Sequence, residues 1–470
     1  MTSHFKFVSF LWFLLSVSVQ AEKPNIIVVF IDDMGWADFS CFGNTEAKTP
    51  NIDRLADEGI SFEHFYVNSP ICSPSRVAIS TGQYPQRWKI TSYLDNRKAN
   101  ARRGMANWLD PKAPMLARSL KEAGYATGHF GKWHMGGQRD VHEAPLITRY
   151  GFDESLTNFE GLGPRVLPTK YQPGGEPPKS HNLGSHRLGH GPVIWQDRSL
   201  ITQTFTQSAL AMVRVAEARA QSFFINVWPD DVHTPMHPPL EAWGDGGKRT
   251  LYLAVLEAMD RQLGELFDHV RSSERLRDNT LILVCSDNGP EVGFGSAGKL
   301  RGHKATLFEG GVRSSLVAWA PGLMGKDNLG KRNLYSVFSA IDLVPSLLTL
   351  AEVPYESERY DGESLANVLL GKSGESRSKP IFFRRPPDRS DFRHYENLPD
   401  LAVRSGPWKL YCNYEGGARE LYHLLEDPSE TVNLAESAEV TKGLVDELLA
   451  WHRSVPPDAG PSLEKPREGK

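Results

Sequence analysis

The sequence predicts an α/β fold in which helices flank a central mixed sheet, followed by a smaller C-terminal α+β subdomain with an antiparallel sheet and a helix. Short apolar runs alternate with amphipathic stretches along most of the chain, which is the pattern of a sheet covered by helices. At 470 residues the chain is long enough for a large core and too long for one ordinary domain. We expect a signal peptide at residues 1–21, a main domain at 22–353, a C-terminal subdomain at 354–455 and a flexible tail at 456–470.

The main domain is expected to alternate helices and strands. Its first two helices are each followed by a glycine, Gly59 and Gly124, which is common at helix C-termini. Its strands are short apolar runs. The expected elements are strands at 25–31, 125–130, 223–228 and 281–284, and helices at 52–57, 116–123, 204–218 and 251–270.

Two segments depart from this alternation. Residues 161–191, rich in Gly, Pro, Lys and His, are expected to form an irregular loop that is long enough to be functional or mobile. After about residue 354 the apolar runs become shorter, with strands expected at 401–403 and 408–411 and a late helix at 441–452. The Pro-rich and charged end reads as a tail.

The N-terminus has the features of a targeting segment. Lys6 precedes an apolar run at 7–19, and Ala21 stands at a plausible cleavage point. We therefore expect export to the periplasm or the exterior. The run is too short and too mixed for a typical membrane span, and an uncleaved anchor is the alternative interpretation.

Composition and cysteine content narrow the class further. The formal charge of -4 gives no sign of a nucleic-acid-binding protein. In an exported protein the four cysteines, Cys41, Cys72, Cys285 and Cys412, could form two disulfides. A reactive Cys72 would leave only three cysteines for pairing. Their wide spacing does not match a zinc-binding pattern. We expect no disulfide pairing, with Cys285 a buried thiol in a strand.

The run from Cys72 to Arg76 places a thiol and a guanidinium within one helical turn. Pro74 fits the first turn of a helix, where its missing N–H costs nothing, so Cys72 would stand at the helix N-terminus beside backbone donors. Arg76, four residues later, would share the same helix face. The pattern suits a site that processes anions, and a surface turn leading into a helix is the simpler alternative.

Acidic pairs follow two of the expected strands. Asp32 and Asp33 close the run at 25–31, and Asp287 and Asn288 close the run at 281–285. Either pair alone is typical of a solvated turn. Together they offer oxygen donors at strand ends, which suit a hard divalent cation, calcium ahead of magnesium, better than zinc.

The segment from Cys72 to Gly82 resembles the signature of the type I sulfatases, in which the cysteine is oxidised to formylglycine. Ile79 stands where that signature usually has Leu. The resemblance extends from Pro24 to about Leu434 as separated motifs in the family's order. It implies an alkaline-phosphatase-like fold, a formylglycine made from Cys72 and a formylglycine-generating maturation enzyme as a partner.

The resemblance also implies roles for residues in the other motifs. Residues 131–136 resemble the family's Gly-Lys-Trp-His loop, which implies that Lys132 contacts the sulfate and His134 the formylglycine. The segment 231–235 implies a sulfate contact for His233, with His237 as a neighbouring candidate, and the segment 300–304 implies that Lys304 is the sulfate-binding lysine. One calcium ion would be bound by Asp32, Asp33, Cys72, Asp287 and Asn288.

Further residues of these motifs have other or unassigned roles. Glu309 and Arg313, in the continuation of the lysine segment, are expected to make structural contacts. After Gly151-Phe152-Asp153, where some members place a polar contact, the sequence does not decide among Ser155, Thr157 and Asn158.

The chemistry that the resemblance implies is sulfate ester hydrolysis by the formylglycine hydrate. One hydroxyl attacks sulfur with Asp33 as a plausible base, and an imidazole can protonate the leaving oxygen. The other hydroxyl then loses its proton to His134, and sulfate is expelled. Calcium, Lys132 and Lys304 would hold the sulfate and polarise its sulfur, and Arg76 completes the set of expected catalytic residues.

The substrate that we expect is a sulfated carbohydrate of galactosamine or galactose type, because residues 227–233 look like bacterial members grouped with N-acetylgalactosamine sulfatases. Two alternatives stay open: a phosphate or phosphonate monoesterase of the same superfamily, and a non-catalytic protein that binds sulfated glycans. A second acidic metal cluster would favour the first, and the sequence shows none. The candidates for contacts to the leaving alcohol are His181, His186, His190, Lys299, Arg301, Arg384 and Arg385.

Overall fold

The computed structural model describes residues 23–158, 161–175, 177–181, 185–188, 191–388, 398–436 and 438–460. The predicted signal peptide and the last ten residues of the predicted tail lie outside these ranges. Within them, no helix combines the length and the apolar character that a membrane span requires.

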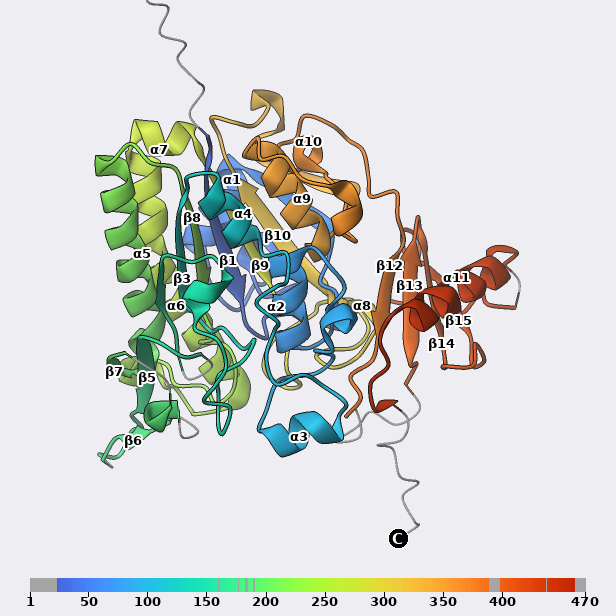
Figure 1. Ribbon diagram of the computed structural model, residues 1–470, viewed down its shortest axis with the longest axis horizontal. Helices are drawn as coiled ribbons and strands as arrows, with labels where there is room; N and C mark the ends of the chain where they lie inside the picture. Colours follow the sequence, from blue (N-terminus) through green and yellow to red (C-terminus); the bar gives the residue numbers. More distant parts are fainter. Residues whose placement is uncertain are drawn as a thin grey trace, which may run out of the picture.

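The centre of the molecule is an eight-stranded mixed sheet, which confirms the predicted α/β class (Figure 1). β10 runs antiparallel to β2 and β9, and the other strands share one direction. In spatial order the strands are β11 (Lys331–Ser339), β2 (Ile60–Tyr66), β10 (Arg313–Trp319), β9 (Thr280–Ser286), β1 (Asn25–Ile31), β8 (Phe223–Trp228), β3 (Ala126–Gly131) and β4 (Glu154–Leu156).

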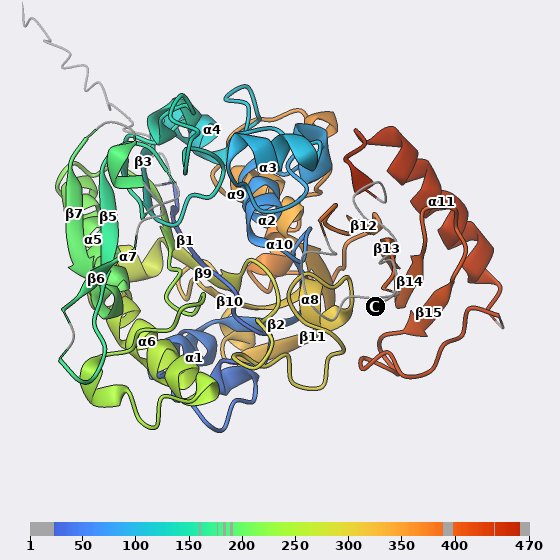
Figure 2. The same ribbon diagram turned by 90° about the horizontal axis from the view of Figure 1, so that it is seen from below.

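Helices cover both faces of this sheet. The face with α1, α5, α6 and α7 lies opposite the face with α2, α4, α9 and α10, as the view from below shows (Figure 2). The bounds of the main-domain helices are α1 (Pro50–Glu58), α2 (Cys72–Thr81), α3 (Arg97–Arg102), α4 (Leu116–Glu122), α5 (Ile201–Ala218), α6 (Lys248–Ser272), α7 (Glu274–Asp278), α8 (Glu309–Val312), α9 (Ala340–Leu350) and α10 (Ala366–Leu369).

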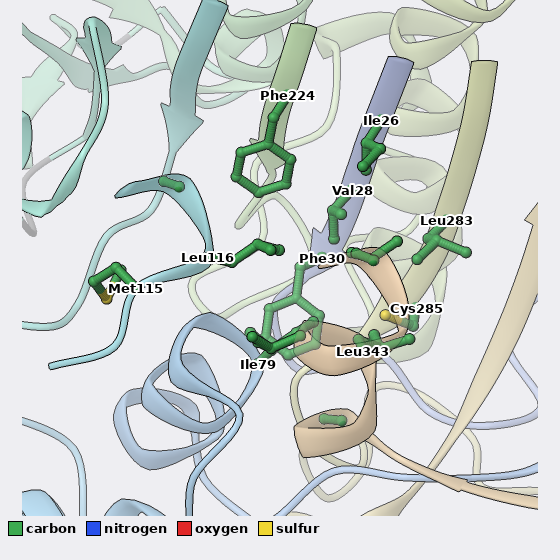
Figure 3. Close-up of a cluster of buried hydrophobic side chains, with 14 of the residues drawn as sticks. Ile26, Val28, Phe30, Ile79, Met115, Leu116, Phe224, Leu283, Cys285 and Leu343 are labelled. Atoms are coloured by element: carbon green, nitrogen blue, oxygen red, sulfur yellow. The ribbon is translucent and has the colours of Figure 1, made fainter. Parts of the chain in front are cut away.

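Strand β1 shows why both faces are covered. Its alternate residues point to opposite sides of the sheet, and all seven are buried. Ile26, Val28 and Phe30 pack on one side with residues of α2, α4 and α9 (Figure 3), whereas Ile27, Val29 and Ile31 pack on the other side with α1, α5 and α6. A continuous apolar strand of this kind is typical of a parallel sheet that is buried on both faces.

The C-terminal subdomain is a four-stranded antiparallel sheet packed against α11 (Val440–Ser454), as predicted. Its strands are β12 (Ile381–Arg384), β13 (Leu401–Ser405), β14 (Trp408–Cys412) and β15 (Glu420–His423). The first residues of the predicted tail contact other parts of the chain: Asp458 forms an ion pair with Arg384 at 3.1 Å, and the Ala459 N–H donates to the Arg103 carbonyl at 3.1 Å.

The prediction of an irregular loop at 161–191 was wrong in part. The segment contains β5 (Arg165–Lys170) and the short β6 (Lys179–Ser180), which form a three-stranded sheet with β7 (Val193–Asp197). Pro168 lies inside β5, the middle strand of this sheet. Since proline is disfavoured within central strands, the local composition hid the strand.

The cysteines behave as predicted. All four are free thiols, and Cys285 lies fully buried in β9.

Candidate active site

The predicted site residues converge on one edge of the central sheet. The carboxyl ends of β1, β8, β9, β3 and β2 meet there, and antiparallel β10 begins at the same edge. Each of these ends carries site residues: Asp32 and Asp33 after β1, Cys72 and Arg76 after β2, Lys132 and His134 after β3, His233 after β8, Asp287 and Asn288 after β9, and Lys304 before β10. Ligand sites in open α/β sheets form at this edge.

Helix α2 begins at Cys72 and is buried along its whole length. Pro74 lies in its first turn, as predicted, and Gly82 ends it with a left-handed φ of 67° that favours glycine. The Ser73 hydroxyl accepts the Leu94 N–H at 2.9 Å, which fixes the helix start against the neighbouring loop. Burial raises the pKa of the Cys72 thiol to about 12, so the unmodified thiol stays protonated at neutral pH and is a weak nucleophile.

Arg76 holds the buried acidic groups in place. Its guanidinium donates to the Lys132 carbonyl at 2.8 Å and pairs with Asp287 at 2.7 Å and Asp32 at 3.2 Å. The same group lies over the rings of Phe30 and Trp228, with its central carbon 5.7 and 5.3 Å from the ring centroids. Its side chain is 0% exposed, so each of these contacts is desolvated.

The carboxylates of Asp32, Asp33 and Asp287 lie within 4.8 Å of one another. All three residues are buried, and the side-chain amide of Asn288 donates to Asp33 at 2.7 Å. This leaves the Asn288 Oδ1 buried and without a hydrogen-bond donor among the described residues. An orphaned amide oxygen beside three carboxylates fits a hard cation with oxygen ligands, so the residues present suit calcium.

The pKa values in the acidic cluster indicate that the surrounding cations do not fully balance the negative charges of its carboxylates. Burial and the negative charge of Asp32 raise the pKa of Asp287 well above its usual range. Burial also acts on Asp32, but the charges of Lys132 and Arg76 outweigh it and lower the Asp32 pKa. A divalent cation would relieve the remaining repulsion between these carboxylates.

Two imidazoles lie in the same cavity as Cys72. Burial, Lys132 and Arg76 lower the pKa of His134, while burial and Lys132 lower the pKa of His233. Both rings are therefore neutral at pH 7. The His134 Nε2 lies 3.2 Å from the Leu94 carbonyl oxygen, which can only accept, so Nε2 carries the proton and Nδ1 keeps its lone pair.

Three residues of the site have a left-handed backbone without being glycine. The φ angles are 59° for Asp33, 50° for His134 and 55° for Arg139. Such conformations cost free energy and concentrate at functional sites.

A cavity of about 390 Å³ opens above Cys72. Cys72, Lys132, His134, His233 and Lys304 all line it. Residues that the sequence did not single out complete its walls: Ile71, Tyr93, Leu94, Arg139, Pro168, Arg198, Asp230, Thr234, Pro235 and Glu291.

Of the residues predicted to contact the leaving alcohol, only His181 lines the cavity among those that the structure describes. Several of the other candidates do not line the cavity, and three of these cations are engaged in ion pairs elsewhere. Arg301 pairs with Glu420, Arg384 with Asp458 and Arg385 with Asp400. His190 lies outside the described residues, and His186 and Lys299 do not line the cavity. Nor do His237, the neighbour of His233, and the three candidates for the unassigned polar contact, Ser155, Thr157 and Asn158.

Arg198 and Arg139 supply the cationic groups that the sequence analysis missed. Arg198 is buried and pairs with Asp230 at 2.7 Å. Arg139 is one-third exposed and pairs with Asp95. Neither arginine belongs to a recognisable motif. The one indication in the sequence is that Asp230, the partner of Arg198, adjoins the segment that carries His233.

Comparison with known proteins gives concordant matches. The sequence model of the Sulfatase family matches residues 24–353. The chain is 31% identical to N-acetylgalactosamine-6-sulfatase of Canis lupus familiaris over 79% of this chain and 70% of that protein. It is 29% identical to N-acetylgalactosamine-6-O-sulfatase of Bacteroides thetaiotaomicron over 92% of this chain and 93% of that protein. The solved structure of Ps i-CgsB in complex with k-i-k-neocarrahexaose superposes with a TM-score of 0.73 at 26% identity, covering 91% of this chain and 92% of that one.

Proposed function

Because the chain belongs to the sulfatase family and is a sulfuric ester hydrolase, we propose that it removes sulfate from a sulfated carbohydrate with a formylglycine made from Cys72. The observation that carries this proposal is the convergence of Cys72, two lysines and two imidazoles in one cavity above a buried acidic cluster. The hydrated aldehyde of formylglycine supplies a nucleophile that a thiol with a pKa of about 12 does not.

We assign the metal site to calcium, bound by Asp32, Asp33, Asp287, Asn288 and the oxygen that replaces the Cys72 sulfur. A bound calcium ion supplies positive charge next to the sulfate oxygens. Several carboxylate and amide oxygens suit the flexible coordination of calcium better than the strict octahedron of magnesium.

The cations of the cavity would hold the sulfate group. Lys132 pairs with Asp32 at 2.6 Å and Lys304 pairs with Asp33, so both ammonium groups are fixed before substrate arrives. Preorganised positive charge of this kind stabilises the charge that develops in the transition state. The neutral His134 can take up a proton at Nδ1, and His233 is assigned to a contact with the sulfate.

Removal of calcium is expected to lower both stability and activity. With EDTA the melting temperature should fall, and added Ca²⁺ should restore it more effectively than Mg²⁺. Calcium at one hundred times its Kd would contribute about 2.7 kcal/mol. Differential scanning fluorimetry with and without Ca²⁺ measures this, and Asn288→Ala should shrink the response because it removes one ligand. Identical melting curves in EDTA and Ca²⁺ would contradict the assignment.

The substrate proposal is supported by the relatives and by the cavity. The two curated relatives are named as sulfatases of N-acetylgalactosamine, and the solved structure holds a neocarrahexaose. In this chain the cavity walls carry fixed polar groups, the Arg198–Asp230 pair, Arg139, His181 and Glu291, which suit the hydroxyls and anionic substituents of a sugar. We therefore propose a galactosamine- or galactose-type saccharide.

Arg139→Met is expected to weaken saccharide hydrolysis selectively. A hydrogen bond from a charged donor contributes about 1.5–3 kcal/mol, so kcat/KM for a sulfated saccharide should fall roughly 10- to 100-fold. The loss for 4-nitrophenyl sulfate should be smaller, because its leaving group offers fewer polar contacts. Arg214→Met, at an exposed position on α5, is the matched control. Equal losses for both substrates would remove Arg139 from saccharide recognition.

We also propose that the protein is exported after cleavage near Ala21 and that a formylglycine-generating enzyme matures it. N-terminal sequencing of the protein recovered from the periplasm or the medium tests the cleavage. The phosphatase alternative has no specific support, since the described residues form no second cluster of His, Cys, Asp or Glu suited to a metal.

A further inference from the structure

The segment from Leu300 to Arg313 carries Lys304 and lies between the two parts of the protein. It includes α8, which Figure 2 shows between the central sheet and the C-terminal subdomain. Its contacts on these two sides are different in kind, and together they connect the subdomain to the active site.

On the active-site side the segment is bonded directly to the loops that carry Cys72 and Asn288. The Lys304 N–H donates to the Pro290 carbonyl at 3.0 Å, and the Ala305 N–H donates to the Pro70 carbonyl at 2.8 Å. The Gly289 N–H donates to the Gly311 carbonyl at 3.0 Å. A Cβ on Gly289 would lie 1.8 Å from the Gly310 carbonyl oxygen, so the Asn288 loop rests tightly on α8.

On the other side, the C-terminal subdomain holds Glu309 at the start of α8. The Lys409 ammonium on β14 pairs with the Glu309 carboxylate at 2.6 Å. The Glu309 N–H donates to Glu430 at 3.0 Å, and the Tyr411 hydroxyl, also on β14, donates to Glu430. Nearer the surface, Arg301 pairs with Glu420 of β15 at 2.9 Å.

The pair between Glu309 and Lys409 is fully desolvated, with both side chains 0% exposed. Buried ion pairs contribute little net stability compared with apolar residues of the same shape, but they fix geometry when their partners are directional. Glu309 lies five residues after Lys304 on a segment that is bonded at both ends. A displacement of Glu309 would therefore be expected to shift Lys304 and the Asn288 loop.

We propose that the C-terminal subdomain positions the sulfate-binding lysine and a metal ligand through this contact, with Lys409 and Glu309 as positioning residues. The inference rests on the proposed function, because it assigns Lys304 to the sulfate and Asn288 to the metal. It gives the subdomain a role in the reaction although none of its residues lines the cavity among those described.

The test compares Lys409→Met with the double variant Glu309→Gln, Lys409→Met. The single variant removes the nearest cation from the buried Glu309 carboxylate, which keeps the Tyr66 hydroxyl at 2.7 Å and the Arg313 guanidinium at 3.4 Å. It should therefore lower the melting temperature and reduce kcat/KM for 4-nitrophenyl sulfate about tenfold or more. The double variant also removes the negative charge that Lys409 balanced and should recover much of the melting temperature, but kcat/KM should stay low because the contact that sets the position is still missing. Titration calorimetry with Ca²⁺ alone should show weaker binding in both variants.

Two further variants keep the test informative if Lys409→Met misfolds or if lower stability alone reduces the activity. Glu420→Gln breaks the partly exposed pair with Arg301 and should reduce kcat/KM about threefold in a protein that folds normally. Leu448→Ala removes buried apolar contacts between α11 and the subdomain sheet. It should lower the melting temperature while leaving kcat/KM and Ca²⁺ binding unchanged at temperatures where the protein is folded.

The outcomes separate the inference from the proposed function. A wild-type protein that is matured yet does not hydrolyse sulfate esters would contradict the proposed function. An active wild type would overturn the inference if the double variant regained full kcat/KM and Ca²⁺ affinity, since the pair would then only balance charge. Wild-type kinetics in both Lys409→Met and Glu420→Gln would overturn it as well.

Discussion

Replacement of Cys72 by Ala or Ser is expected to reduce sulfate ester hydrolysis at least about 10,000-fold, the scale of loss seen when a catalytic nucleophile is removed. Alanine offers no oxygen at the base of the cavity. Serine offers one hydroxyl, whereas the mechanism needs two on one carbon, so a sulfated serine would have no route to release. The residue lies at the start of α2 with 2% exposure, and either substitution is small enough to leave the helix in place.

Initial rates with 4-nitrophenyl sulfate measure this effect, with the substitution verified by mass spectrometry. Melting temperatures within a few degrees of the wild type would show that the fold is retained. Turnover near the wild-type rate in either verified variant would remove Cys72 from the role of nucleophile.

Arg76→Met is expected to destabilise the protein by about 3–5 kcal/mol and to abolish activity. The substitution leaves Asp32 and Asp287 buried without the cation that pairs with both, and breaking a buried pair from one side has a cost of this size. The loss of the contacts with Phe30 and Trp228 adds to it. Because burial and Asp32 already raise the Asp287 pKa, removal of Arg76 should favour protonation of Asp287 further.

Urea unfolding of the wild type and the variant measures this difference in the free energy of unfolding. The matched control is Arg54→Met, which removes an exposed arginine 3.6 Å from Asp268 and should change stability by less than about 1 kcal/mol. Equal unfolding midpoints for Arg76→Met and the wild type would contradict the role given to Arg76 as the centre of the buried charge network.

The sequence predicted those strands of the central sheet whose residues form a simple apolar pattern. β1, β8 and β9 consist mainly of apolar residues and were identified. β2 and β10 were not, because β2 contains Glu63 and His64 and β10 begins with Arg313 and two serines, so neither shows a clear apolar run. The buried partners of these polar groups, such as the Glu63 carbonyl that accepts from Arg313, come from distant parts of the chain.

The site was predictable to the extent that its residues lie in local motifs at strand ends. Cys72, Lys132, His134, His233 and Lys304 meet in one cavity, as the interpretation required. Residues of the outer walls could not be predicted, because their place depends on how the loops pack. Arg139 is held by Asp95 from a separate loop, whereas Arg301, predicted for this wall, is held by Glu420 of the C-terminal subdomain.

The most direct test of the central claim is the mass of the tryptic peptide from Leu55 to Arg76, taken from protein produced together with an active formylglycine-generating enzyme. The account predicts a peptide in which the Cys72 thiol is replaced by an aldehyde, with the loss of sulfur and two hydrogens and the gain of one oxygen. An unmodified cysteine in that peptide, from a preparation that nevertheless hydrolyses sulfate esters, would contradict it.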